Sequence, residues 1–176
     1  ILREKGTLLG KIIYEDKDVE LFDPSKVNLV AEVSTKEKKV YGNGKHKITL
    51  IDCGVKYNII RNLIKRDATV TLVPWDYDFT GDDYEGLFIS NGPGDPKQCT
   101  ATINNLKKAY KSDKPITGIC LGNQLMALAA DADTYKLKYG HRSHNQPAIQ
   151  VGTNKSFVTS QNHGYATDND TLTKEW

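Results

Sequence analysis

Short apolar runs alternate with helically spaced apolar residues through the middle of the chain. Residues 48–52 form an apolar run that predicts a strand, and residues 57–66 place four isoleucine and leucine side chains on one helical face. A second run, at residues 69–73, is rich in β-branched side chains, which favour strands. The pattern therefore predicts a strand, a helix and another strand in succession.

The same alternation of apolar runs and helically spaced residues continues from residue 86 to about residue 130. Residues 86–90 predict a strand that enters the turn-forming loop 91–96, and a polar helix is expected over residues 101–111. Residues 115–117 predict the next strand, and the apolar segment after Cys120 predicts a helix. This order implies an α/β fold with an open, mostly parallel sheet flanked by helices. Ligands bind beyond the carboxyl ends of such strands, so loop 91–96 and Cys120 can share one crevice.

The two ends of the chain have weaker patterns. Residues 8–14 are compatible with a strand, and residues 34–47 are rich in Lys, Ser, Thr and Gly, which favours an exposed linker or hairpin tip. Three shorter strands are expected in the last third, at residues 134–139, 148–151 and 156–159.

Composition narrows the class of protein. The 176 residues carry a net charge of +2, which does not favour a nucleic-acid or anionic-membrane surface, and no apolar run approaches a membrane span. Cys53, Cys99 and Cys120 show no disulfide or zinc spacing, so no metal is expected and a reducing compartment is favoured. The first residues lack both an initiator Met and a signal-peptide pattern, and we expect the chain to begin inside a longer protein.

The segment from Gly118 to Gln124 carries the clearest chemical signal. A single thiol, Cys120, stands between Gly118 and Gly122 where the predicted strand turns into a helix, which is the pattern of a nucleophile elbow. The positive end of that helix would favour the thiolate. The alternative is a buried cysteine that acts only as a small hydrophobic residue.

A cysteine that attacks an acyl carbon needs donors for the oxyanion that it creates. The N–H of Leu121 is one candidate, and a glycine of the loop around Gly92 could supply the second. An ordinary turn is the alternative for that loop, and the Gly-Lys-Ser/Thr ending of a phosphate-binding loop is missing.

Three motifs together resemble a known family. These are the elbow at 118–124, the Ser-Asn-Gly-Pro-Gly-Asp-Pro loop at 90–96 and Gln-Asn-His-Gly-Tyr-Ala at 161–166. Together they are similar to the class I, triad-type glutamine amidotransferases. Residues 2–6, 52–61 and 145–147 look like one branch of that family, the glutaminase subunit or domain of carbamoyl-phosphate synthetase.

The resemblance implies roles for individual residues. Cys120 would attack the glutamine carboxamide, and Leu121 and Gly92 would form the oxyanion hole. Five further residues would bind glutamine or line its pocket: Gly94, Gln124, Asn162, Gly164 and Tyr165. In the family the general base belongs to a downstream His-Pro-Glu unit, and His163 is a residue beside the pocket.

The chain departs from the family pattern in several places. It contains no His-Pro-Glu, so we expect a fragment in which 1–45 is a linker and remnant of an N-terminal small domain and 46–176 is a truncated amidotransferase domain. Asn123 stands where many relatives carry His. Asp131 and Asp133 replace a Gly-Ala-Lys-like turn, and an acid at a helix C-terminus costs about 0.3–1 kcal/mol.

The resemblance also implies partners and a compartment. Ammonia from L-glutamine would pass to a large synthetase subunit, or to fused synthetase domains, that uses ATP, Mg and bicarbonate, while this domain would hold no cofactor. The location would be the cytoplasm, with the mitochondrion as the alternative. Two other functions stay open: an impaired, regulatory module of an ammonia-using synthetase, and a part of another class I amidotransferase.

Overall fold

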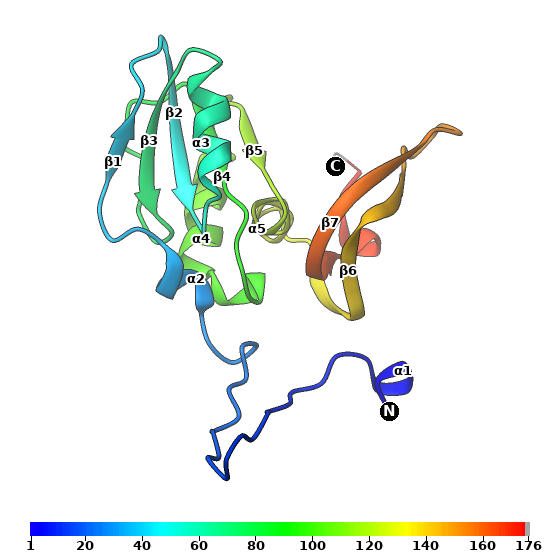
Figure 1. Cartoon of the computed structure of the whole chain (residues 1–176). Coiled ribbons are helices and arrows are strands. Elements are labelled where there is room, and N and C mark those ends of the chain that lie inside the picture. Colours follow the sequence, from blue (N-terminus) through cyan, green and yellow to red (C-terminus); the bar gives the residue numbers. More distant parts are fainter. Residues whose placement is uncertain (175–176) are drawn as a thin grey trace. The chain divides into compact units, whose positions relative to one another are not determined.

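The computed structural model describes residues 1–174 and divides them into two compact units (Figure 1). One unit combines residues 1–23 with residues 135–166, and the other combines residues 24–134 with the segment from residue 167 onward. The boundary expected between a small-domain remnant (1–45) and an amidotransferase domain (46–176) stays a prediction. No helix within residues 1–174 has the length and apolar character needed to cross a membrane.

The larger unit is built on a five-stranded sheet with the order β1-β3-β2-β4-β5. Its strands are β1 (Lys39–Tyr41), β2 (His46–Asp52), β3 (Ala68–Pro74), β4 (Gly86–Ile89) and β5 (Ile116–Gly118). The pairs of β2 with β3, β2 with β4 and β4 with β5 are parallel, whereas β1 is an antiparallel edge strand on β3. The predicted open, mostly parallel α/β sheet is confirmed.

Three helices follow strands of the sheet where the sequence predicts helices: α3 (Tyr57–Ile64), α4 (Thr100–Ala109) and α5 (Leu121–Ala129) (Figure 1). Two further elements were not predicted: α2 (Leu29–Val33), which precedes β1, and the short 3-10 turn η1 (Pro96–Gln98). The segment before β2 differs from its prediction as a linker, because β1 forms within it. Antiparallel pairing with β3 satisfies the backbone hydrogen bonds of β1, although the polar sequence of this segment does not predict a strand.

Alternating side chains of β2 serve the two faces of the sheet. Leu50 belongs to a buried cluster with Ile60 of α3, whereas Ile51 belongs to a cluster with Leu106 of α4 and Leu125 of α5. Successive strand residues point to opposite faces, so one apolar run can build both layers of core. All five of these side chains are at most 2% exposed.

The smaller unit contains a two-stranded sheet of β6 (Thr134–Ile149) and β7 (Ser156–Thr167). The ranges expected as strands at 134–139 and 156–159 do lie in strands. Their number and lengths were wrong, because 134–139 and 148–149 belong to one continuous strand and β7 extends to Thr167. The N-terminal part has one short helix, α1 (Leu2–Lys5), and the expected strand over 8–14 is wrong, since Tyr14 makes only an isolated bridge with Lys17.

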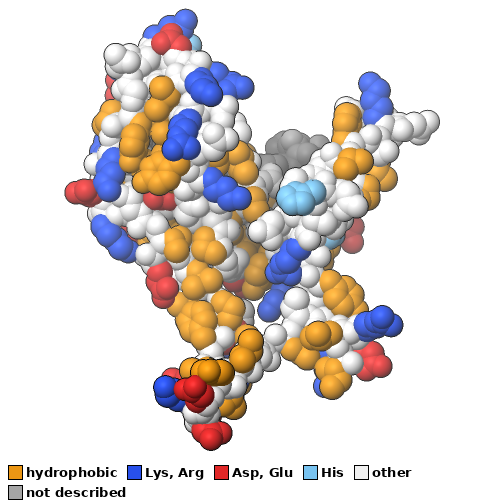
Figure 2. All heavy atoms as spheres, viewed as in Figure 1, with side chains coloured by type: hydrophobic (Ala, Val, Ile, Leu, Met, Phe, Trp, Pro, Cys, Tyr) orange, Lys and Arg blue, Asp and Glu red, His pale blue; other side chains and the backbone are white. Residues whose placement is uncertain are grey.

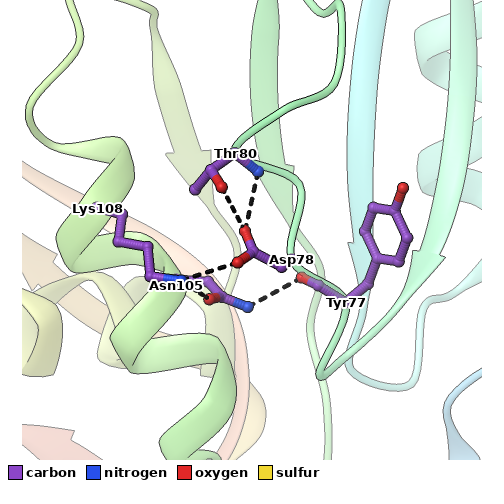
Figure 3. Close-up of polar contacts among 5 residues, drawn as sticks. All are labelled: Tyr77, Asp78, Thr80, Asn105 and Lys108. Atoms are coloured by element: carbon purple, nitrogen blue, oxygen red, sulfur yellow. Dashed lines mark hydrogen bonds and ion pairs between the residues drawn. The ribbon is translucent and has the colours of Figure 1, made fainter.

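The loop between β3 and β4 is tied to α4 by a network of polar contacts (Figure 3). Lys108 Nζ lies 2.8 Å from Asp78 Oδ2 and 3.2 Å from Asn105 Oδ1. The Asn105 amide donates to the Tyr77 carbonyl at 3.0 Å, and the Thr80 hydroxyl donates to Asp78 at 2.6 Å. These contacts fix a long irregular loop against a helix on one side of the sheet.

The turn after α5 accommodates Asp131 in a left-handed conformation, with φ of 63°. An unfavourable interaction with the helix C-terminus was expected there. The Lys107 ammonium lies 2.5 Å from the Asp131 carboxylate and partly neutralises its charge, while Lys97 does the same for Asp133 at 2.6 Å. A cost that remains is the backbone conformation, which glycine adopts more readily.

Candidate active site

Cys120 occupies the sharp turn between β5 and α5 and is exposed. Its φ of 54° and ψ of −108° are unusual for a residue with a side chain, as a strained nucleophile elbow requires. A Cβ atom on Gly118 would lie 2.5 Å from the Gly122 carbonyl carbon, and one on Gly122 would lie 2.4 Å from the Ile89 oxygen. The turn can therefore close only with glycine on both sides of the cysteine, and the buried-cysteine alternative is wrong for Cys120.

The two candidate oxyanion donors come from adjoining loops. A Cβ atom on Gly92 would lie 2.7 Å from Leu121 Cδ2 and 2.1 Å from the Cys53 oxygen, so only glycine fits. Leu121 is the first residue of α5, and the N–H groups of a first helical turn have no intrahelical acceptor. Such an arrangement can direct two backbone donors at an oxygen bound near Cys120.

A polar clamp, defined here as Ser90 and Asn91, holds the Gly92 loop against the end of β2. The Asn91 side chain accepts the Lys56 N–H at 3.1 Å and donates to the Gly54 carbonyl at 3.1 Å. The Ser90 hydroxyl accepts the Cys53 N–H at 2.9 Å and donates to the Asn91 carbonyl at 2.8 Å. The clamp thus connects two loops that are about 35 residues apart in the sequence.

The clamp was missed by the sequence analysis, although a signal was present. Ser90 and Asn91 directly precede the Gly-Pro-Gly turn at the carboxyl end of β4. Short polar side chains at a strand end commonly bond to neighbouring backbone groups, so this position was a candidate for such a role. Their partners lie beyond β2, and only the parallel pairing of β2 with β4 brings them within reach.

The electrostatics around Cys120 differ from the expectation drawn from its helix. Burial raises the pKa of the thiol above its ordinary value, even though the residue as a whole is exposed. A hydrogen bond from the Leu121 N–H and the positive charge of Lys56 lower the pKa, but less strongly. Burial therefore favours the thiol over the thiolate, which is the opposite of the effect expected from the helix N-terminus. A base near Cys120 would assist its attack on an amide.

Histidine is not placed to serve as that base within the larger unit. His46 is the one histidine among its described residues, and it starts β2, at the opposite end of the parallel sheet from the elbow. Its Nδ1 lies 3.4 Å from Glu85. Residues 1–174 also contain no group of three or more His, Cys, Asp or Glu side chains that could hold a metal ion.

Two of the predicted substrate-binding residues lie in the same unit as Cys120. Gly94 has a φ of 86° in the loop after Gly92, a conformation that suits glycine. Gln124 is four residues after Cys120 on α5, and its N–H donates to the Cys120 carbonyl at 3.2 Å. Residues four apart share a helix face, so the Gln124 side chain lies on the face that begins at the elbow.

The other three predicted residues, Asn162, Gly164 and Tyr165, lie on β7 in the smaller unit. A site that these residues share with Cys120 stays a prediction, because they belong to a different compact unit. His163 is engaged locally: its Nδ1 lies 2.7 Å from the Tyr165 carbonyl and its Nε2 lies 3.0 Å from Gln161 Oε1.

Comparisons with known proteins agree with the geometry. The family model for class-I glutamine amidotransferases matches residues 49–176. The chain is 55% identical to "Multifunctional protein CAD" of Squalus acanthias over 99% of its own length and 8% of that protein. It is 51% identical to "Carbamoyl-phosphate synthase [ammonia], mitochondrial" of Aquarana catesbeiana, covering 98% of this chain and 12% of the relative.

A smaller relative gives the same picture. "Carbamoyl phosphate synthase arginine-specific small chain" of Saccharomyces cerevisiae is 49% identical over 99% of this chain and 45% of its own. The chain thus spans less than half the length of each of these three curated relatives.

Solved structures share the fold at low identity. A putative GMP synthase component from Thermoplasma acidophilum matches with a TM-score of 0.60 and 23% identity, over 73% of this chain and 69% of that one. A glutamine amidotransferase from Thermotoga maritima matches with a TM-score of 0.57 and 16% identity, over 72% and 64% respectively.

Proposed function

Because this chain belongs to the class-I glutamine amidotransferase family, we propose that it supplies the glutamine-hydrolysing part of a carbamoyl-phosphate synthetase. The observation that carries the proposal is the strained elbow at Cys120, closed by two glycines and adjoining the Gly92 loop. Relatives near 50% identity over almost the whole chain carry carbamoyl-phosphate synthase names, which favours this branch of the family.

The proposed reaction begins at the Cys120 sulfur. The sulfur forms a bond to the glutamine carboxamide carbon, and the N–H groups of Leu121 and Gly92 hold the negative oxygen of the tetrahedral intermediate. The carbon–nitrogen bond then breaks, and the thiol proton leaves on ammonia by way of a base. Water attacks the remaining thioester and releases glutamate and the free thiol.

The raised pKa of the Cys120 thiol makes that base essential to the proposal. We propose that it belongs to a His-Pro-Glu unit elsewhere in the full protein. Five residues would hold the α-amino and α-carboxylate groups of glutamine and line the pocket: Gly94, Gln124, Asn162, Gly164 and Tyr165.

The ammonia would pass to a large synthetase subunit or to fused synthetase domains. That partner would bind ATP, Mg and bicarbonate, and the protein would act in the cytoplasm or the mitochondrion. The product would enter pyrimidine or arginine synthesis.

Trapping with a glutamine-mimicking chloroketone tests the nucleophile in the full-length protein. We expect covalent modification of Cys120 that L-glutamine slows and that the Cys120→Ser variant abolishes. Cys53 and Cys99 are internal controls: both are fully buried, and burial raises the pKa of Cys99 to about 12. Labelling that survives in Cys120→Ser would contradict the proposed role.

A second function is favoured by two observations. Several similar relatives carry the word ammonia in their names. Asn123, within the elbow segment, stands where many amidotransferases have His. The module would then support a synthetase that uses free ammonia. Carbamoyl phosphate formation by the full protein with glutamine, compared with formation with ammonium, separates the two; synthesis with ammonium alone would favour the second.

A further inference from the structure

A cleft of about 380 Å³ opens at the β1 side of the larger unit and takes no part in the proposed chemistry. Val33, Val55 and Leu72 give it apolar walls, and the rings of Tyr41 and Tyr57 also line it. The space-filling view shows apolar side chains gathered over the part of the sheet that carries β1 and β3, with basic ones around them (Figure 2). The cleft therefore combines aliphatic and aromatic walls.

A buried carboxylate adds negative charge to the cleft. Asp52 is 5% exposed and lines the cleft at the end of β2. Its oxygens accept the N–H groups of Thr35, Gly54 and Val55 at 2.8–2.9 Å. Within residues 1–174 it forms no ion pair with a cationic side chain, although buried charges are usually paired. The cleft thus presents a carboxylate that has no ion-pair partner among the described residues.

Lys39 is the cation among the lining residues, and its ammonium pairs with Glu37 rather than with Asp52. Its ammonium lies 3.6 Å from the Glu37 carboxylate, and both side chains are exposed to water. An exposed pair of this kind holds its partners weakly, and the lysine stays hydrated. A cation that enters the cleft would therefore meet the Asp52 carboxylate without displacing an internal ion pair.

The rim of the cleft is apolar and exposed, as at a protein interface. Val33 and Tyr57, which both line the cleft, are 53% and 62% exposed. A charged anchor in a pocket, surrounded by apolar contacts that exclude water, is the usual composition of an interface hot spot. Among cationic side chains, arginine stacks on aromatic rings and donates several N–H groups to one carboxylate, and it is more weakly hydrated than lysine.

We propose that this cleft docks an arginine side chain of a protein partner. The guanidinium lies toward Asp52, and the aliphatic stem lies along Val55 and Leu72 between the two tyrosines. The partner's neighbouring residues cover the apolar rim. Gly54 lines the cleft and also accepts a hydrogen bond from Asn91, so the docked partner contacts the turn that the polar clamp holds.

Two capped probes test the charge requirement on the full-length protein. We expect N-acetyl-arginine methylamide to give saturation-transfer NMR signals, and the neutral, nearly isosteric citrulline analogue to bind at least tenfold more weakly. An acetylated Leu-Arg-Val amide, which also reaches the rim, is expected to bind at least tenfold more tightly than the capped arginine. Equal binding of arginine and citrulline would overturn the proposal.

Variants at an exposed position locate the binding. Tyr57→Ala should weaken binding of the Leu-Arg-Val probe at least fivefold, Tyr57→Phe should retain it, and Tyr14→Ala, 72% exposed in the other unit, should leave it unchanged. Asp52→Asn should abolish binding of the probe. Asp52 also accepts the Gly54 and Val55 N–H groups and so holds the turn after β2. The comparison of Tyr57→Ala with Tyr57→Phe is therefore the decisive test. Binding that is indifferent to Tyr57→Ala, or agmatine binding as tightly as the peptide, would rule out a protein-docking cleft.

Discussion

Gly92 lies directly against Leu121: a Cβ atom added to Gly92 would be 2.7 Å from Leu121 Cδ2. The two loops that carry the candidate oxyanion donors are therefore in contact, although they come from different strand–helix units. Gly92 also lies close to the Cys53 carbonyl, so its loop is packed between the start of α5 and the turn after β2. Such close packing orients backbone donors before a substrate arrives.

Gly92→Ala should damage this arrangement. The added methyl group would lie 2.1 Å from the Cys53 oxygen, so the loop must shift, with a loss of about 1–3 kcal/mol of stability as in other overpacked sites. Chloroketone labelling of Cys120 should slow about tenfold or more, because a misplaced donor stabilises the oxyanion poorly. Gly81→Ala is the matched control, since nothing lies within 4 Å of its added Cβ, and it should behave as wild type.

Asn91→Ala should release the Gly92 loop from the end of β2. The Lys56 N–H and the Gly54 carbonyl would lose their partner, which we expect to cost about 1–3 kcal/mol in urea unfolding. Glutamine protection of Cys120 against labelling should also weaken. The exposed Asn104 on α4 is the control position, where alanine should be neutral or slightly stabilising. Equal stability of the two variants would contradict a clamp at Asn91.

Alkylation of Cys120 should depend on pH as a thiol with a raised pKa requires. Iodoacetamide reacts with the thiolate, so the rate for this chain should continue to rise above pH 9, the ordinary pKa of the group. Lys56→Gln removes a positive charge that lowers the pKa, and it should slow the reaction at pH 8. Lys65→Gln, at the end of α3, should not. Identical rates for both variants would exclude an effect of Lys56.

Asp78→Asn should alter stability only above acidic pH. The hydrogen bonds from Lys108 and Thr80 lower the pKa of Asp78 from 3.8 to about 2 (Figure 3). The charged form is favoured in the folded state, so its contribution is complete above pH 3.8 and disappears as pH falls through about 2. At pH 6 the melting temperature of wild type should be higher than that of Asp78→Asn, and the two melting temperatures should converge near pH 2. A difference that persists there would contradict an electrostatic origin.

Asp131→Gly should stabilise the chain despite the loss of an ion pair. Glycine relieves the positive φ of 63° after α5, and we expect a net gain of about 0.5–1 kcal/mol. Asp131→Ala is the informative comparison, because alanine loses the contact with Lys107 and retains the strained backbone. It should be less stable than wild type in thermal unfolding. If alanine were as favourable as glycine, the backbone would not be the cause.

Local sequence patterns were sufficient for the central elements of the fold. The apolar runs and helical spacing located both ends of β2, α3, β3 and β4 to within two residues, because these segments bury side chains on a regular period. The flanking glycines likewise identified the elbow at Cys120, since steric exclusion of Cβ atoms acts between near neighbours.

Polar segments were predicted less well. The strand β1 and the long strands β6 and β7 have little apolar periodicity. β1 pairs with β3, which lies beyond β2 in the sequence, and β6 and β7 pair with each other. A strand of that kind is stabilised by its neighbour rather than by its own composition. The segment over residues 8–14 shows the converse, because its apolar residues find no such neighbour and form no strand.

The sequence by itself determined the family, the α/β architecture and the position of the elbow at Cys120, because each depends on residues close together along the chain. Only the tertiary structure showed that Asn91 clamps the turn after β2 and that burial outweighs Lys56 in the pKa of Cys120. It also showed that Asp52 lines a cleft and, among residues 1–174, forms no ion pair. These properties depend on distances between residues that the parallel sheet brings together. Hydrogen bonds and desolvation act over a few ångströms of space, whatever the separation in sequence.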